Sequence, residues 1–112
     1  MATQGILSVQ RGSTVLMKFI AGSDGYNVTY LANDVRRFIE DKGRLPTRGE
    51  AYELAVKAKL GDEASLVVMD EEGWEFRGGD EIHPRYRETF QRPRFNPRWE
   101  WGTADYVRVI RL

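Results

Sequence analysis

The chain has 112 residues, 17 basic and 17 acidic side chains, and no cysteine. The length suits one domain over residues 1–112, and a hydrophobic fraction of 41% is too high for an intrinsically disordered chain. The missing cysteine excludes disulfides, thiolate catalysis and cysteine-ligated zinc. Because we find neither a membrane-spanning apolar run nor a signal peptide, we expect a soluble, cytoplasmic protein without a membrane partner.

The first predicted elements form a β-hairpin. Residues 5–10 and 14–20 are β-prone, and Gly12 lies in the short turn between them. The alternation of side chains gives the second strand two faces. One face carries Val15, Met17 and Phe19, and the other carries Leu16, Lys18 and Ile20.

Two helices follow. Apolar residues at helical spacing predict the first over residues 28–42, with Asn27 as its N-cap and Gly43 as a left-handed stop. Thr47 and Glu50 have the spacing of a capping box, so they predict the start of a second helix that ends near residues 60–61. The apolar stripe of this second helix contains small alanines, which favours close packing of the helix on the sheet or on the first helix.

The rest of the chain is predicted to be mainly strands. We expect a central strand at 65–69, a hairpin strand at 74–77 with Trp74 and Phe76 inward, a long loop at 81–97, and strands at 98–101 and 106–112. The order is therefore ββααββ-loop-ββ. This order predicts a single layered α+β domain, with an antiparallel or mixed sheet and two helices on one face.

No catalytic or metal-binding motif is recognisable. His83 is the only histidine, and no serine has the context of a catalytic nucleophile. The acidic run at 70–72 is typical of a hairpin tip, with weak magnesium or calcium binding as the alternative. The turn at 22–25 lacks both phosphate-loop patterns. We therefore expect no catalytic residue, metal or cofactor, and keep as an alternative a small hydrolase that uses His83 or carboxylates of the acidic residues 61–82.

Charge is unevenly distributed. Residues 61–82 contain one base and eight acids, whereas residues 83–112 contain seven arginines and three acids. Either these segments are neighbours that neutralise each other, or the arginine-rich part faces an anionic partner.

Residues 84–101 interleave arginines with aromatic side chains. The candidate binding residues are Arg85, Arg87, Arg92, Arg94, Arg98, Phe95, Trp99 and Trp101. This composition is typical of a loop packed on a core, of a protein interface and of a single-strand nucleic-acid surface. We expect a non-catalytic protein-interaction or regulatory domain, whose partner is another protein or a second copy in a homodimer. Binding of single-stranded nucleic acid is the alternative.

Three short segments resemble a family of small uncharacterised bacterial and phage proteins. They are residues 2–6 with the hairpin that follows, Asp24-Gly25-Tyr26, and the strand Tyr106-Val107-Arg108-Val109. The family starts with a Gly-Thr-Arg-Gly-like run and has an Asp-Gly-Tyr-Pro turn. Here Gln4 stands for the arginine and Asn27 for the proline. The resemblance implies a prokaryotic or phage accessory protein and no particular activity.

Overall fold

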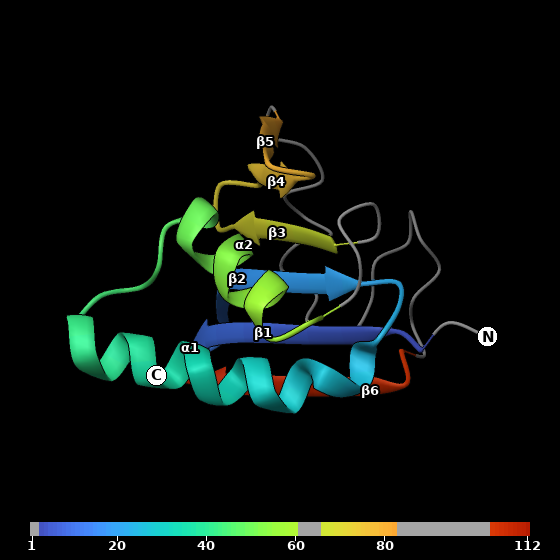
Figure 1. The fold of residues 1–112 in the computed structure, drawn as a ribbon. Coiled ribbons are helices and arrows are strands. Elements are labelled where there is room, and N and C mark those ends of the chain that lie inside the picture. Colours follow the sequence, from blue (N-terminus) through green and yellow to red (C-terminus); the bar gives the residue numbers. More distant parts are fainter. Residues whose placement is uncertain (1–2, 61–65, 83–103) are drawn as a thin grey trace.

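A computed structural model describes residues 3–60, 66–82 and 104–112 of the chain. It confirms the α+β class: a six-stranded mixed sheet is combined with two α-helices (Figure 1). The elements are β1 (Gly5–Arg11), β2 (Thr14–Ala21), the 3₁₀ helix η1 (Gly25–Asn27), α1 (Val28–Lys42), α2 (Arg48–Lys57), β3 (Leu66–Asp70), β4 (Glu75–Arg77), β5 (Asp80–Ile82) and β6 (Tyr106–Arg111).

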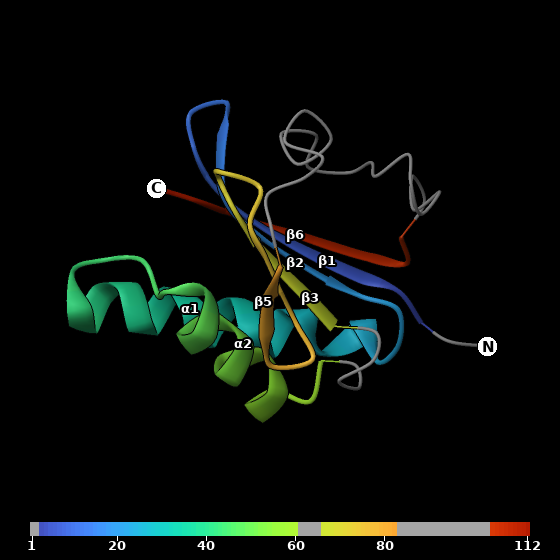
Figure 2. The same cartoon turned by 90° about the horizontal axis from the view of Figure 1, so that it is seen from above.

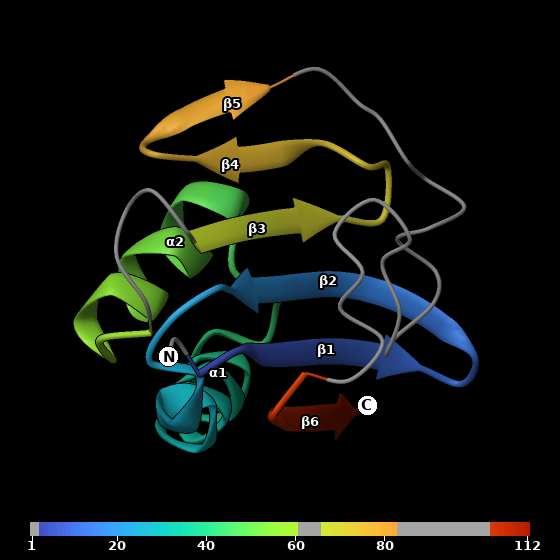
Figure 3. The same cartoon turned by 90° about the vertical axis from the view of Figure 1, so that its right-hand side faces the viewer.

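The sheet has the strand order β5-β4-β3-β2-β1-β6 (Figure 3). Every pair of neighbours is antiparallel except β1 and β6, which are parallel. The last strand therefore returns to the side of the sheet farthest from β5. Both helices cover the same face (Figure 2).

The predicted order of elements needs one correction. Sequence analysis ended a strand near Gly78 and assigned residues 81–97 to a loop, but β5 follows β4 directly. Gly78 and Gly79 have φ angles of 59° and 93°. Two consecutive positive φ values make the tight hairpin turn that joins these short strands. The strand predicted at 98–101 lies outside the described residues.

The helix boundaries follow local capping. Helix α1 has the predicted bounds, and Gly43 ends it in the left-handed conformation. Asn27 precedes the helix but does not cap it; its Nδ2 donates to the Lys59 carbonyl oxygen at 2.8 Å. The capping box of α2 is confirmed, since Thr47 Oγ1 accepts from the Glu50 amide and Glu50 Oε1 accepts from the Thr47 amide.

The main core lies between the helices and the sheet. It includes Leu7, Val9, Met17, Phe19, Val28, Leu31, Val35, Ala51, Ala55 and Val68. A second cluster lies on the opposite face and consists of Ile6, Val15, Ile20, Val67 and Met69. Burial on both faces accounts for the almost wholly apolar sequence of β3, the predicted central strand.

A β-bulge corrects the predicted faces of β2. Val9 pairs with Met17 but Gln10 pairs with Val15, so Leu16 is the extra residue. Val15 consequently lies on the face of Ile20, not on that of Met17 as the alternation predicted. The alternation alone misses this because a bulge shifts the pattern by one residue.

Two glycines bring the start of β1 against η1. The Gly25 amide donates to the Thr3 carbonyl oxygen at 2.8 Å. A Cβ on Gly25 would lie 2.3 Å from the carbonyl carbon of Gln4, and one on Gly5 would lie 2.6 Å from the Gly25 Cα. Gln4 in turn accepts from the Tyr106 amide at 3.1 Å. Residues 3–5, Gly25 and Tyr106, one part of each segment that carries the family resemblance, thus lie together at one corner of the fold.

We expect Gly25→Ala to lower the free energy of unfolding by about 3 kcal/mol, because its Cβ would overlap backbone atoms that cannot move alone. Urea denaturation measures this. Gly49→Ala in α2 is the matched control; its Cβ would lie 4.0 Å from Phe76, so it should stabilise by roughly 0.5–1 kcal/mol. Equal effects of the two substitutions would contradict the close contact.

Candidate functional site

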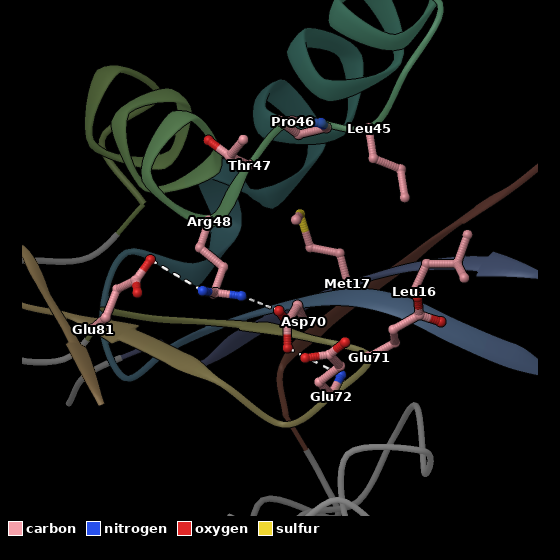
Figure 4. A pocket seen from close by; sticks show the side chains of 10 residues that line it. All are labelled: Leu16, Met17, Leu45, Pro46, Thr47, Arg48, Asp70, Glu71, Glu72 and Glu81. Carbon is pink, nitrogen blue, oxygen red and sulfur yellow. Dashed lines mark hydrogen bonds and ion pairs between the residues drawn. The ribbon is translucent and has the colours of Figure 1, made fainter. Parts of the chain in front are cut away.

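A pocket of about 460 Å³ opens where the end of β3 faces the start of α2 (Figure 4). One part of its lining is apolar and comes from the bulged region of β2 and from the connection between the helices. These residues are Leu16, Met17, Leu45 and Pro46. In Figure 4, Met17 points from the sheet toward the helix connection. The β2 bulge thus supplies an apolar floor beside a charged wall.

Arg48 organises the charged wall. It is the first residue of α2, and its guanidinium donates to Asp70 Oδ2 and, at 3.1 Å, to Glu81 Oε1. The guanidinium also lies 5.5 Å from the centroid of the Trp74 ring, within cation–π range. A positive charge at a helix N-terminus is unfavourable with respect to the helix dipole. The two carboxylates compensate for this placement.

Asp70 holds both the arginine and the turn after β3. Its Oδ1 accepts from the amides of Glu72 and Trp74, each at 3.0 Å, while Oδ2 binds Arg48. Both side chains of the Arg48–Asp70 pair are about one-fifth exposed (22% and 19%). Partial burial strengthens such a pair relative to one at the surface. Asp70 therefore acts as a structural anchor of the pocket.

The pocket carries a surplus of negative charge. Four carboxylates line it, from Asp70, Glu71, Glu72 and Glu81, against the single guanidinium of Arg48, which gives a formal charge of −3. Glu71 and Glu72 are exposed, and neither side chain forms an ion pair with another described residue. The unbalanced charge is therefore concentrated on the turn between β3 and β4.

The described residues contain no group of three or more histidine, cysteine or acidic side chains that could hold a metal ion. Of the acidic run at 70–72, Asp70 is the last residue of β3, and Glu71 and Glu72 lie in the turn before β4. The ligand set needed for the magnesium or calcium alternative is not found in this part of the chain.

The predicted binding residues belong to a different part of the chain from the residues that line this pocket. Arg85, Arg87, Arg92, Arg94, Arg98, Phe95, Trp99 and Trp101 lie outside the described residues, as does His83. Sequence analysis missed Arg48, and it included Glu81 only as one of the acids of residues 61–82. The available signal for Arg48 was its position directly after the N-cap Thr47, where a basic residue is unusual. The position of Glu81 in the pocket was not predicted, because β5 was not predicted.

A row of buried polar side chains crosses the other face of the sheet. Ser8 pairs with Lys18, Lys18 with Met69, and Met69 with Glu75. The exposed fraction is 0% for Ser8, 1% for Lys18 and 0% for Glu75. Glu75 Oε2 accepts from Arg77 Nη2 at 3.2 Å.

Burial also changes the titration of Lys18. Removal from water disfavours the charged ammonium, which lowers the pKa of Lys18 from 10.5 to about 8. Elsewhere in the fold, an exposed ion pair favours the charged form of a side chain. Hydrogen bonds from Arg44 and from the Thr47 amide lower the pKa of Glu50 to about 2, because they stabilise its charged form.

Comparisons with known proteins found no matching family model, no matching curated protein and no matching solved structure. The resemblance to small bacterial and phage proteins therefore stays a prediction. No helix among the described residues is long and apolar enough to cross a membrane.

We expect the free energy of unfolding to rise with pH between about 8 and 10.5, because the unfolded chain then binds more protons at Lys18 than the folded one. The rise should approach roughly 1.4 kcal/mol for each unit of pKa difference. Chemical denaturation of the wild type and Lys18→Met measures it. The variant should lose this rise, whereas Lys57→Met, at an exposed lysine, should retain it. Identical pH profiles for all three proteins would contradict the assignment.

Proposed function

We propose that the protein is a non-catalytic interaction domain that binds a lysine or arginine side chain of a partner protein in the acidic pocket. The observation that supports this proposal is the combination of an apolar floor with a formal charge of −3 in one concavity. Its volume of about 460 Å³ is within the range of ligand-binding pockets. It can therefore accept a side chain together with part of the segment that carries it.

The chemistry of long basic side chains matches both parts of the pocket. Lysine and arginine have aliphatic stems that pack on apolar surface while the charged head remains near water. Leu16 and Leu45 would contact such a stem, and the carboxylates of Glu71 and Glu72 would receive the head. Because Asp70 and Glu81 already bind Arg48, the incoming cation competes with no ion pair between described residues for the two turn glutamates.

The same geometry favours binding over hydrolysis. Glycoside hydrolysis needs two carboxylates facing each other across a cleft. Glu71 and Glu72 are consecutive residues of one turn, and both oxygens of Asp70 are occupied by hydrogen bonds. The pocket would also repel phosphate. The nucleic-acid alternative rests on residues 84–101, outside the described residues, and a salt-dependent mobility shift would test it separately.

We expect capped tetra-arginine and tetra-lysine peptides to shift the amide resonances of Leu16, Thr47 and Glu72 in two-dimensional NMR spectra at about 50 mM salt. Electrostatic attraction is strong at this ionic strength and is screened as salt is raised. Glu71→Gln with Glu72→Gln should weaken peptide binding about tenfold or more, since two facing charges are removed. A tetra-glutamate peptide should give no shifts.

Glu40→Gln with Asp41→Asn is the matched control, because it removes the same charge from an exposed part of α1. This control should bind the basic peptides like the wild type. Equal weakening by the two double variants would mean that only net charge matters and would contradict the pocket. Binding of free polyamines without binding of either basic peptide would indicate a small-molecule site instead.

A further inference from the structure

The outer edge of β6 is open among the described residues. Its only neighbour among the described strands is β1, and Figure 3 shows it at the end of the sheet opposite β5. The amides of Tyr106 and Leu112 donate to the carbonyl oxygens of Gln4, just before β1, and of Gln10 in β1, at 3.1 and 2.8 Å. In a parallel pair, every second residue of a strand directs its backbone groups toward the neighbouring strand, here the even-numbered residues of β6. The backbone groups of Val107, Val109 and Arg111 therefore point outward, where an added strand could bind them.

Strand β6 and the residue after it expose large apolar side chains to solvent. Tyr106 and Leu112 are 38% and 45% exposed, and both lie on the helix side of the strand. Arg111 is exposed on the other side, and Asp105, which directly precedes the strand, is exposed while its Oδ2 accepts from the Gln4 amide at 3.0 Å. The strand thus has an apolar residue near each end and opposite charges near opposite ends.

We propose that β6 pairs antiparallel with β6 of a second copy, with Val109 on the twofold axis. In this register Val107 faces Arg111 of the second copy, so the outward backbone groups of both strands bind each other. Tyr106 lies opposite Leu112 of the second copy, which covers both exposed apolar side chains. The contact is isologous, so each interaction occurs twice. Two six-stranded sheets would become one continuous sheet.

Charge complementarity selects a second copy as the occupant. Asp105 would lie diagonally across from Arg111 of the second copy, within reach of a long side chain. The twofold symmetry creates two such pairs. An unrelated extended segment would need the same order of acidic, apolar and basic residues to match this edge. The strand itself already has that order.

Arg108 limits the strength of this association. Its Nη1 donates to the outward carbonyl oxygen of Val107 at 3.2 Å, so it covers one of the acceptors. In the proposed register it also lies diagonally across from Arg108 of the second copy, with like charge. Natural edge strands often use charged residues in this way. We therefore expect a reversible dimer and not a permanent one.

The dimer goes beyond the proposed function and uses a different surface. The acidic pocket includes Glu81 of β5, at the far edge of the sheet from β6. Loss of peptide binding and loss of dimerisation can therefore be measured independently. Either proposal can fail while the other holds.

Sedimentation velocity between about 1 and 200 µM tests the dimer, because an interface this small gives weak association. We expect the wild type to show a concentration-dependent monomer–dimer equilibrium. Arg111→Glu and Asp105→Lys should each be monomeric, since each variant places like charges opposite one another. Mixing the two should restore dimers, because all cross-pairs are then between opposite charges. Arg36→Glu, the same charge change on α1, should dimerise like the wild type.

Two further results decide the proposal if Asp105→Lys fails to fold through loss of its hydrogen bond to the Gln4 amide. Arg108→Gln should strengthen the dimer several-fold, because it removes the like-charge pair and frees the Val107 carbonyl. Tyr106→Asp should weaken it, whereas Tyr30→Asp on α1 should not. A wild type that stays monomeric at 200 µM, a dimer unaffected by Arg111→Glu, or open-ended assembly would overturn the proposal.

Discussion

The close contact between Gly5 and Gly25 is the constraint on which the arrangement of the fold depends. It lets the backbone at the start of β1 touch the turn that leads into α1, with no side chain between them. The carbonyl oxygen of Gln4, one residue before Gly5, accepts a hydrogen bond from the Tyr106 amide. This contact places β6 beside β1 in parallel. One backbone crossing thereby positions the hairpin, the first helix and the last strand.

The pocket depends on two local irregularities of the chain. The bulge at Leu16 changes the face of Val15 and supplies part of the apolar floor. The capping box of α2 fixes Arg48 at the helix start, where it reaches both Asp70 and Glu81 (Figure 4). Neither feature is a catalytic device. Together they join surfaces from β2, β3, β5 and α2 into one concavity with both apolar and acidic parts.

Sequence patterns predicted most elements because the relevant signals are local. The bounds of α1, the left-handed Gly43 and the capping box at Thr47 all follow from residues within one or two helical turns. The bulge and β5 were missed because they depend on pairing with another strand. The pocket was missed for the same reason: Arg48 and Asp70 are 22 residues apart, and no pattern along the chain connects them.

The position of the pocket at one edge of the sheet has a consequence for recognition. If two copies join through the opposite edge, their pockets lie at the two ends of the extended sheet, well separated and available together. A partner with two basic segments joined by a long enough linker could occupy both. The second segment would then bind at a high local concentration, so modest affinity at each pocket would add up to strong retention by avidity. Partners with a single basic segment would exchange rapidly.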